Sequence, residues 1–341
     1  MKISFLVTYY QQKQYIAQSM ESLLALEKPE EWEILIGDDG STDGSIETEK
    51  AYVNKDPEHI RLFVMPRDPD KIYTAVERAG ANRLNLIRQM TGDCYCIIDG
   101  DDFYSETDFV PEAMKVLTEH PEISVVGFDT WYWRKGEPEK AKNPGSHTPV
   151  FESRKKYMRW KYTHAGACIY RSSIHTPNNM ALLEKLNFFD DNEIILNALA
   201  AGKMARIHRP VYAYRQEDSS LYHSINPSER AALNVAGMGT ALAMMGEKWE
   251  KDLTARYATA VIMAWLLRRT LRKQIRPERF ETYMAICHRA DFDRGIKLLN
   301  YPDLDTPGRK EVRRFVRSAC LESPLRLLYA LTQIHGGGQK A

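Results

Sequence analysis

Apolar residues in the first third of this chain alternate between short continuous runs and longer stretches with helical spacing. The run Ile3–Val7 predicts a buried strand, and the segment of about residues 14–25 that follows carries apolar side chains at the spacing of an α-helix. A second strand is predicted at Glu33–Ile36. The same alternation continues with a helix from an N-cap at Ser45 through Tyr52, a strand at Arg61–Val64, a helix at about residues 79–90 and a strand at Cys94–Ile98. Such alternation predicts an α/β fold with a mostly parallel sheet flanked by helices.

The pattern changes along the rest of the chain. A helix at Val110–Glu119 and a strand at Ile123–Phe128 prolong the alternation, and a polar loop rich in Pro and Gly is predicted over residues 134–149. From Pro227 onward helical periodicity dominates. We therefore expect an α/β domain over residues 1–225 and an α-helical extension over residues 226–341.

Two acidic clusters lie about sixty residues apart, and each follows a predicted strand. The first is the run Asp38–Ser45, with the sequence DDGSTDGS, and the second is Asp99–Asp102, with the sequence DGDD. Both clusters present carboxylates at the C-terminal end of a strand, where open α/β sheets bind ligands. Adjacent carboxylates repel one another unless a cation joins them, and Asp-x-Asp on a turn suits a hard divalent ion that takes its other ligands from phosphates and water.

Together with Ile3–Tyr10, these two clusters resemble the family 2 glycosyltransferases, which have the Rossmann-like GT-A fold. The order and spacing of the three pieces carry the resemblance over the first 110 residues, and a further match extends to about residue 220. The resemblance implies inverting transfer of a sugar from a nucleotide diphosphate donor with the help of Mn²⁺ or Mg²⁺.

The resemblance assigns donor-binding roles near the first cluster. Thr8 and Tyr10 stand where the family contacts the nucleotide base, although the usual proline before the threonine-like position is absent. Asp39 matches the carboxylate that accepts a base N–H, most often from uracil, and Asp38 lies close enough to help. A tyrosine pair that only packs the sheet edge is the alternative for the first strand. For Asp43 we expect a cap or turn role.

The second cluster matches the ribose and metal positions. Asp99 is expected to bind the ribose, Asp101 to ligate Mg²⁺ or Mn²⁺ directly, and Asp102 to support them. Arg83, nine residues before Gly92, matches a family arginine whose charge suits the ribose or diphosphate. A surface arginine is the alternative for this residue.

Acceptor-side residues follow further along the chain. The run Phe188–Glu193 resembles the motif in which an acidic pair opens a helix beneath the acceptor, so that Asp191 is the expected general base and Asp190 its neighbour. A helix cap is the alternative for Asp191. His164 precedes a strand of small residues and is expected to line the acceptor cleft or to be a satisfied polar residue. Arg215 is the candidate for the β-phosphate, and Glu217 stands where the family often has a histidine.

Composition and apolar runs indicate the cellular location to expect. The 341 residues include five cysteines, too few and too scattered for a disulfide framework. The N-terminus opens into a strand without the basic and apolar regions of a signal peptide, and the longest apolar run, Tyr257–Leu267, is too short to cross a bilayer. We expect a cytoplasmic protein that is soluble or peripheral to the membrane.

Charge is unevenly distributed. From Ala255 to the end there are 17 Lys and Arg against 8 Asp and Glu, a balance of +9 beside a total of +1. In particular, Lys310, Arg313, Arg314 and Arg317 are interleaved with apolar residues at helical spacing. This segment is expected to contact anionic lipid at the inner face of the plasma membrane, to pack against the catalytic domain, or to pack against a second subunit in a homo-oligomer.

The resemblance therefore implies a glycosyltransferase that moves a sugar, with a UDP-sugar as the expected donor, to a glycan or lipid-linked acceptor in bacterial surface polysaccharide synthesis, with no nucleic-acid partner. Two alternatives stay open. A metal-dependent nucleotidyltransferase would share the acidic site but usually has a Gly-rich phosphate loop near its start, which is missing here. A non-catalytic nucleotide-sugar or glycan-binding module would need Asp39 and Asp99 but not Asp191.

Overall fold

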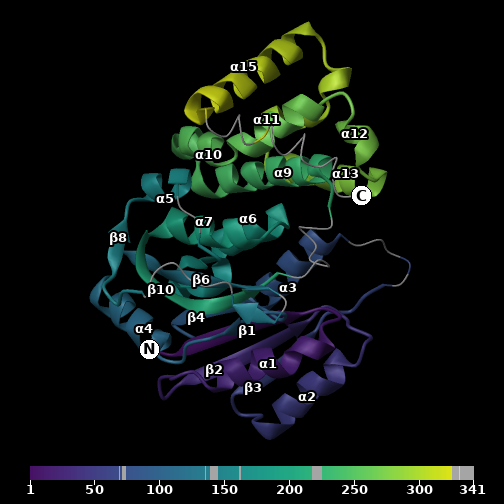
Figure 1. Ribbon diagram of the computed structural model, residues 1–341. Helices are drawn as coiled ribbons and strands as arrows, with labels where there is room; N and C mark the ends of the chain where they lie inside the picture. Colours follow the sequence, from purple (N-terminus) through teal and green to yellow (C-terminus); the bar gives the residue numbers. More distant parts are fainter. Residues whose placement is uncertain are drawn as a thin grey trace. The chain divides into compact units, whose positions relative to one another are not determined.

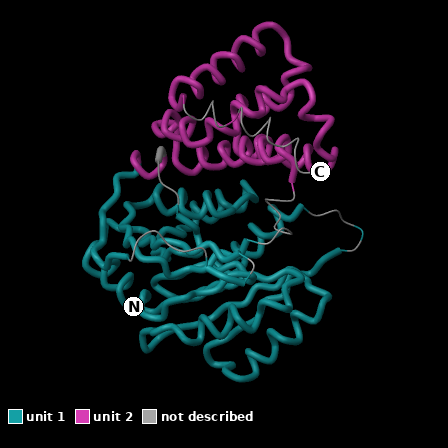
Figure 2. Tube along the Cα trace, in the orientation of Figure 1, with its two compact units in different colours: residues 1–154, 162–217 teal, residues 155–161, 218–341 magenta. Residues whose placement is uncertain are grey.

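The computed structural model describes residues 1–68, 70, 74–134, 136–138, 145–160, 163–216, 225–324 and 330. The chain divides into two compact units (Figure 2): residues 1–154 with 162–217, and residues 155–161 with 218–341. The first unit is the α/β part and the second is helical, and each is described by itself.

A parallel half-sheet forms the N-terminal part of the first unit (Figure 1). Its elements are β1 (Ile3–Tyr9), α1 (Lys13–Leu24), β2 (Trp32–Asp38), α2 (Ser45–Lys55), β3 (Ile60–Val64), α3 (Ala75–Gln89) and β4 (Cys94–Asp99). The strand order here is β3-β2-β1-β4, and all three pairings are parallel. The register places Tyr9 beside Asp38 and Thr8 beside Asp99. Both acidic clusters therefore begin at the same edge of the sheet.

The second half of the sheet is mixed. Its elements are β5 (Phe103–Tyr104), α4 (Phe109–Glu119), β6 (Ile123–Arg134), β7 (Glu137–Pro138), β8 (Val150–Glu152), the 3₁₀ turn η1 (Ala165–Ala167), β9 (Cys168–Arg171), the turn η2 (Ser172–Ile174), α6 (Pro177–Leu186), α7 (Asp191–Ala201) and β10 (Lys203–Arg215). Strand β9 runs antiparallel between β4 and β6, whereas β6 and β10 are parallel. Over the described residues, ten strands form one sheet.

Helices cover both faces of this sheet. Apolar residues of α1, α2 and α4 join one buried cluster with Phe5 and Val7 of β1. Figure 1 shows α6 and α7 on the opposite side of the sheet from α1 and α2. The predicted α/β fold with flanking helices is confirmed.

Two local predictions differ from the structure. The strand expected at Ile123–Phe128 continues to Arg134, because its second half pairs with β10 as far as Arg215. The segment expected to run directly from His164 into a strand first forms the turn η1, in which the Gly166 N–H donates to His164 Nδ1 at 3.2 Å. A side chain at Gly166 would collide with the Tyr212 ring, so the turn requires glycine there.

The second unit is built from helices. They are α5 (Arg154–Trp160), α9 (Pro227–Met245), η3 (Glu247–Trp249), α10 (Glu250–Arg256), α11 (Ala258–Leu267), α12 (Leu271–Gln274), α13 (Pro277–Arg289), α14 (Asp293–Leu299), η4 (Tyr301–Asp303) and α15 (Thr306–Glu322). Small residues along α9 are buried, and Gly239 lets the Phe292 ring approach the helix backbone. No helix in the described part of the chain is both long and apolar enough to cross a bilayer.

The helix α15 uses its apolar face inside its own unit. Val312, Phe315 and Val316 are at most 6% exposed, and the Phe315 ring contacts that of Phe292. This packing lies within the helical unit, and the expected contact with the catalytic domain or a second subunit stays a prediction. Its apolar side chains are not available for insertion into a lipid surface.

Candidate active site

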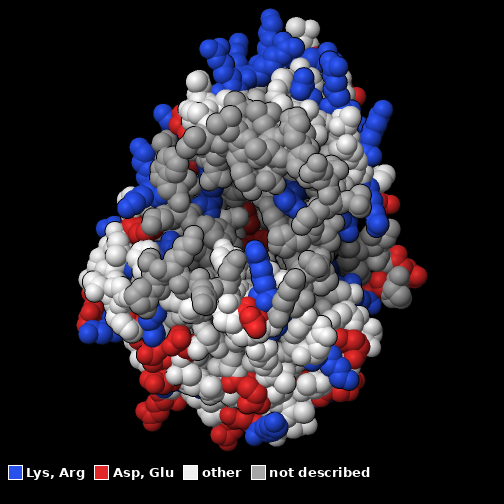
Figure 3. Space-filling view, viewed as in Figure 1, with Lys and Arg blue, Asp and Glu red and all other residues white. Residues whose placement is uncertain are grey.

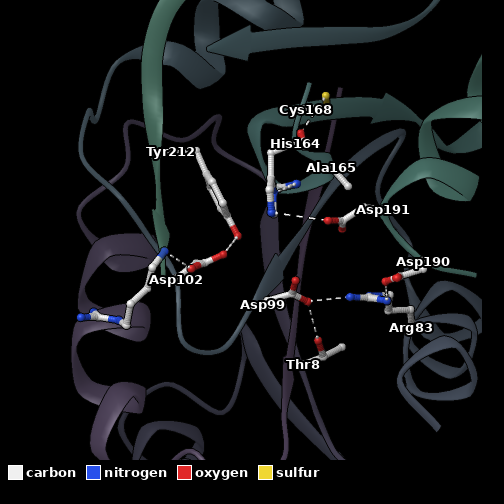
Figure 4. Close-up of polar contacts among 12 residues, drawn as sticks. Thr8, Arg83, Asp99, Asp102, His164, Ala165, Cys168, Asp190, Asp191 and Tyr212 are labelled. Carbon is white, nitrogen blue, oxygen red and sulfur yellow. Dashed lines mark hydrogen bonds and ion pairs between the residues drawn. The ribbon is translucent and has the colours of Figure 1, made fainter. Parts of the chain in front are cut away.

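The acidic groups predicted for the site converge at the C-terminal edge of β4, next to the first turn of α7 (Figure 4). Asp99 ends β4, Asp191 is the first residue of α7, and Arg83 reaches them from α3. Parallel strands bring their C-terminal ends to one edge, which explains why residues far apart in sequence meet here.

Arg83 joins two of the predicted carboxylates. Its guanidinium donates to Asp99 Oδ1 at 2.8 Å, to Asp190 Oδ1 at 2.9 Å and to the Phe189 carbonyl at 3.2 Å. Arg83 is 5% exposed, so it is not a surface arginine. It holds the end of β4 and the start of α7 together. Its expected role at the ribose or diphosphate stays a prediction.

Asp99 stays ionised because of this contact. Burial alone would raise its pKa, but the Arg83 charge, with contributions from His164 and Thr8, lowers it below the usual value. Thr8 Oγ1 lies 3.5 Å from Asp99 Oδ1. Asp99 is thus a fixed negative charge at the centre of the site, and its 30% exposed side chain is accessible to a ligand.

Asp191 faces His164 instead of capping its helix. The two side chains approach at 3.5 Å between Nε2 and Oδ2, and His164 Nδ1 accepts the Gly166 N–H. A neutral His164 therefore carries its proton on Nε2, the atom that points at Asp191. Burial, together with the nearby charges of Asp190 and Asp99, raises the pKa of Asp191 to about 6, although His164 opposes the shift.

The helix cap itself is Asp190, and its side chain makes no capping hydrogen bond. Its Oδ1 is engaged by Arg83, while the side chain as a whole is 47% exposed. The interpretation of Asp191 as an ordinary cap is therefore not supported by the geometry. A half-buried carboxylate whose pKa is raised to about 6 is a group suited to accept a proton.

Asp102 joins the acidic turn Asp99–Asp102 to strand β10 through two hydrogen bonds. It is 2% exposed, and it accepts the Tyr212 O–H at 2.6 Å and the Arg215 backbone N–H at 2.7 Å. Burial and the charges of Asp101 and Asp99 raise its pKa well above the usual value. Asp102 thus attaches the turn to β10, as its expected supporting role requires.

Arg215 lies across the same turn. Its Nε donates to the Asp101 carbonyl at 2.7 Å, one terminal nitrogen donates to Gln18, and its guanidinium lies 4.7 Å from the centre of the Tyr15 ring. The charge of Arg215 therefore lies beside Asp101. Glu217, which follows it, lies outside the described residues.

Asp101 is the group that fits a divalent cation. Its carboxylate has no side-chain partner among the described residues, and burial and the charge of Asp99 raise its pKa to about 6. A hard cation would stabilise the ionised form in this setting. Within the described residues, no three carboxylate, imidazole or thiol groups form a complete metal cage. A Mg²⁺ or Mn²⁺ ion held by Asp101 would thus take its other ligands from phosphates and water.

Asp39 is covered by arginines that the sequence did not point to. Arg67 and Arg78 both form ion pairs with its carboxylate, and Arg67 Nε also donates to its carbonyl at 2.6 Å. The Arg67 guanidinium lies 3.9 Å from the centre of the Tyr10 ring, which is 43% exposed. Tyr10 and Asp39 thus lie on the two sides of one arginine. A residue-by-residue match to the family could not reveal Arg67, because it lies between the motifs.

Asp38 points away from this edge. It is fully buried, its Oδ1 accepts the Ser41 N–H at 2.7 Å, and it hydrogen-bonds to Glu49 of α2. Burial, the charge of Asp38 and this hydrogen bond raise the pKa of Glu49 to about 9. Asp38 is therefore a structural residue of the turn and is not placed to contact a ligand. Asp43 accepts the Ser45 N–H at 3.0 Å, which confirms its expected turn role.

The acceptor side contains aromatic residues that the motifs also did not indicate. His164 stacks against Tyr212, with ring centres 4.9 Å apart, and contacts Tyr214 at 4.7 Å. Figure 4 shows His164 between Tyr212 and Asp191. His164 is 3% exposed, so it acts on its neighbours more than on a ligand. Because side chains alternate along a strand, the spacing Tyr-Ala-Tyr places both tyrosines on one face. This spacing is the sequence signal that could have revealed the aromatic residues.

The sheet topology and the acidic edge define an α/β protein with a candidate ligand site at the C-terminal ends of its parallel strands, and comparison with known proteins identifies the family. The model of glycosyl transferase family 2 matches residues 4–175, half of the chain. The chain therefore belongs to glycosyl transferase family 2.

Individual relatives are distant. Poly(ribitol-phosphate) β-N-acetylglucosaminyltransferase TarS of Staphylococcus aureus is 23% identical over 216 residues, which are 63% of this chain and 35% of TarS. This chain thus spans about a third of the length of that relative. The uncharacterized glycosyltransferase YibD of Escherichia coli is 24% identical over 238 residues, 66% of this chain and 65% of YibD.

Solved structures agree on the fold. The crystal structure of S. aureus TarS residues 1–349 in complex with UDP-GlcNAc matches with a TM-score of 0.57 and 16% identity, covering 100% of this chain and 93% of that one. A Pyrobaculum calidifontis mannosyltransferase in complex with GDP-Man and Mn²⁺ matches with a TM-score of 0.51 and 16% identity, covering 97% and 86%.

Proposed function

We propose that this chain is an inverting, metal-dependent glycosyltransferase. Its proposed donor is a nucleotide diphosphate sugar, with UDP-sugars as the first candidates, and its proposed acceptor is a glycan or a lipid-linked molecule. The observation that carries the proposal is the pairing of Asp99 and Asp101 at the end of β4 with Asp191 at the start of α7. Family membership and the UDP-GlcNAc carried by one structural neighbour support the choice of donor.

Asp191 is the proposed general base. It accepts the proton of the acceptor hydroxyl as that oxygen attacks the anomeric carbon, while the bond from this carbon to the diphosphate oxygen breaks and the nucleoside diphosphate leaves. His164 holds the Asp191 carboxylate in place through Nε2 at 3.5 Å. Attack from the side opposite the leaving group inverts the anomeric centre.

The donor is proposed to lie along the edge from Asp39 to Asp101. In this proposal Asp39 and the Tyr10 ring contact the nucleotide base, Asp99 the ribose, and Arg215 the diphosphate. Mg²⁺ or Mn²⁺ held by Asp101 would neutralise charge on the leaving diphosphate. Arg67 and Arg78 both form ion pairs with Asp39. A nucleotide base that hydrogen-bonds to this carboxylate must therefore share it with the two arginines.

We also propose that the second unit contacts anionic membrane at the inner face of the plasma membrane. Figure 3 shows Lys and Arg side chains gathered over α15, at the top of the view. Lys310, Arg313, Arg314 and Arg317 are exposed and form no ion pair within the described residues. Because the apolar face of α15 is buried, this contact rests on charge alone.

Donor turnover tests the function. The purified chain is incubated with UDP-, GDP- and TDP-sugars in Mn²⁺, and release of the nucleoside diphosphate is followed by mass spectrometry, since transfer to water exposes donor use before the acceptor is known. We expect release from at least one UDP-sugar, dependent on Mn²⁺ or Mg²⁺. Release of a nucleoside monophosphate together with sugar 1-phosphate, the products of water attack on the α-phosphate, would instead favour a nucleotidyltransferase. Binding of UDP without turnover, even with glycan acceptors added, would favour a non-catalytic module.

A further inference from the structure

The face of the sheet that holds His164 continues outward from Asp191 as a row of aromatic rings. Tyr212 and Tyr214 are two residues apart on β10, so their side chains lie on one face, and both contact His164. Tyr132 of β6 is the register partner of Tyr214, with ring centres 6.2 Å apart. The row therefore runs from Asp191 through His164 and Tyr214 to Tyr132.

The two tyrosines on β10 differ in what their hydroxyls do. The Tyr212 hydroxyl is buried and donates to Asp102. The Tyr214 hydroxyl has no hydrogen-bond partner among the described residues, although burial and the charges of Asp102, Asp191 and Asp99 raise its pKa. A phenol O–H without an acceptor in the described part of the chain is available to a ligand there.

Tyr132 completes the surface. It is 39% exposed, which is unusual for a large ring that meets another aromatic side chain edge to face at 75°. An exposed ring next to a free hydroxyl suits a pyranose, whose C–H face packs on an aromatic ring while its hydroxyls need polar partners.

We propose that Tyr132 and Tyr214 form the acceptor subsite, in which Tyr132 stacks against the pyranose ring of the acceptor and the Tyr214 hydroxyl donates to one of its oxygens. This inference rests on the proposed transferase function and deepens it, because it makes the acceptor a sugar and not a bare lipid or polyol phosphate. The contacts lead from Tyr132 through Tyr214 and His164 to Asp191, so the attacking hydroxyl would extend from that sugar toward Asp191.

Saturation-transfer NMR with methyl glycosides of glucose, N-acetylglucosamine, galactose and mannose tests the subsite in the protein loaded with UDP and Mn²⁺. At least one glycoside should bind the wild type. Tyr132→Ala should weaken that binding about 5- to 10-fold through lost stacking, and Tyr214→Phe about 2- to 10-fold through one lost hydrogen bond. Phe151→Ala, which removes a more exposed ring from β8 (49% against 39% for Tyr132), should leave binding unchanged.

The outcomes separate this inference from the proposed function. If UDP and Mn²⁺ still stabilise the protein but no glycoside binds, or if the two tyrosine variants bind as the wild type does, the subsite is wrong and the transferase proposal survives. If UDP itself does not bind, the proposed function fails first. Loss of UDP binding in Tyr132→Ala or Tyr214→Phe would show a general disturbance of the site and would also overturn the assignment.

Discussion

At the scale of single residues, the surroundings of each carboxylate set its pKa and its contacts, and so its proposed role. Asp99 is held ionised by Arg83, Asp102 is kept close to β10 by Tyr212, and Asp191 has a pKa of about 6 because it is buried beside other acids. Chemically identical groups thereby acquire different proposed roles, as a fixed charge, a support and a base.

Asp191→Asn should separate catalysis from binding. The amide cannot accept a proton, so sugar transfer should fall roughly 10²- to 10⁴-fold while UDP affinity stays near wild type. In the wild type, the base works as a carboxylate and is protonated below its pKa, so kcat/KM should fall as the pH drops through about 6. A pH series of transfer rates at saturating Mn²⁺ checks both points. Near-normal turnover by the variant would remove Asp191 from the role of base.

Sequence reasoning located this site well but could not assign every contact. The motifs identified Asp99, Asp101 and Asp191 because these residues stand at the ends of elements whose pattern is visible in the chain. The family match predicted that Arg83 binds the ribose or diphosphate. In the structure, its guanidinium forms ion pairs with Asp99 and Asp190. Such a contact joins residues 107 positions apart, and spacing along a chain carries no information about which partner a long side chain will choose.

At the scale of elements, the unusual feature is Glu49, a fully buried acid on α2 that faces Asp38 at the end of β2. Its folded-state pKa of about 9 lies above the ordinary value of 4.5, so the folded protein keeps a proton that the unfolded chain loses between these two values. The free energy of unfolding therefore decreases as the pH rises through this window.

Glu49→Gln should stabilise the protein at neutral and mildly alkaline pH. The amide is neutral and can still donate a hydrogen bond to Asp38, so the free energy of unfolding should rise by about 4 kcal/mol more at pH 8 than at pH 5, because each pH unit between the two pKa values corresponds to about 1.4 kcal/mol. Denaturant unfolding at the two pH values measures this difference. Glu47→Gln, an exposed change on the same helix, is the control. Equal effects at both pH values would show that Glu49 is ionised in the folded state.

Elements were more predictable than contacts. The strands at Ile3–Val7 and Cys94–Ile98 were correct to within two residues at each end, because a buried strand carries its own apolar signature. The extension of β6 to Arg134 escaped prediction because its stability comes from pairing with β10, some eighty residues later. The turn at Ala165–Ala167 depends likewise on the Tyr212 ring.

At the scale of the whole molecule, the chain combines an acidic α/β unit with a helical unit whose charge is positive. Residues from Ala255 onward carry a balance of +9, and the exposed face of α15 concentrates part of it. The apolar half of the predicted amphipathic pattern is buried within the unit. Binding to lipid through this surface would therefore be electrostatic and reversible.

Reversing charge on α15 tests this surface. Arg313→Glu with Arg317→Glu should abolish co-sedimentation with anionic liposomes at low salt, since each basic residue contributes on the order of 1 kcal/mol near such a surface. Wild-type binding should weaken as ionic strength rises. Lys50→Glu with Lys203→Glu changes the net charge equally, on the first unit, and should retain binding. Wild-type binding that is equal on neutral liposomes, or no binding at all, would contradict the membrane proposal.

The most direct test of the central claim is calorimetric titration of UDP into the protein with and without Mn²⁺, compared between the wild type, Asp101→Asn and the exposed control Glu106→Gln. We predict that Mn²⁺ strengthens UDP binding to the wild type and the control, and that Asp101→Asn loses this metal-dependent gain. UDP binding that is equal with and without Mn²⁺, or a gain that survives in Asp101→Asn, would contradict the account of a nucleotide-sugar site organised around a metal at Asp101.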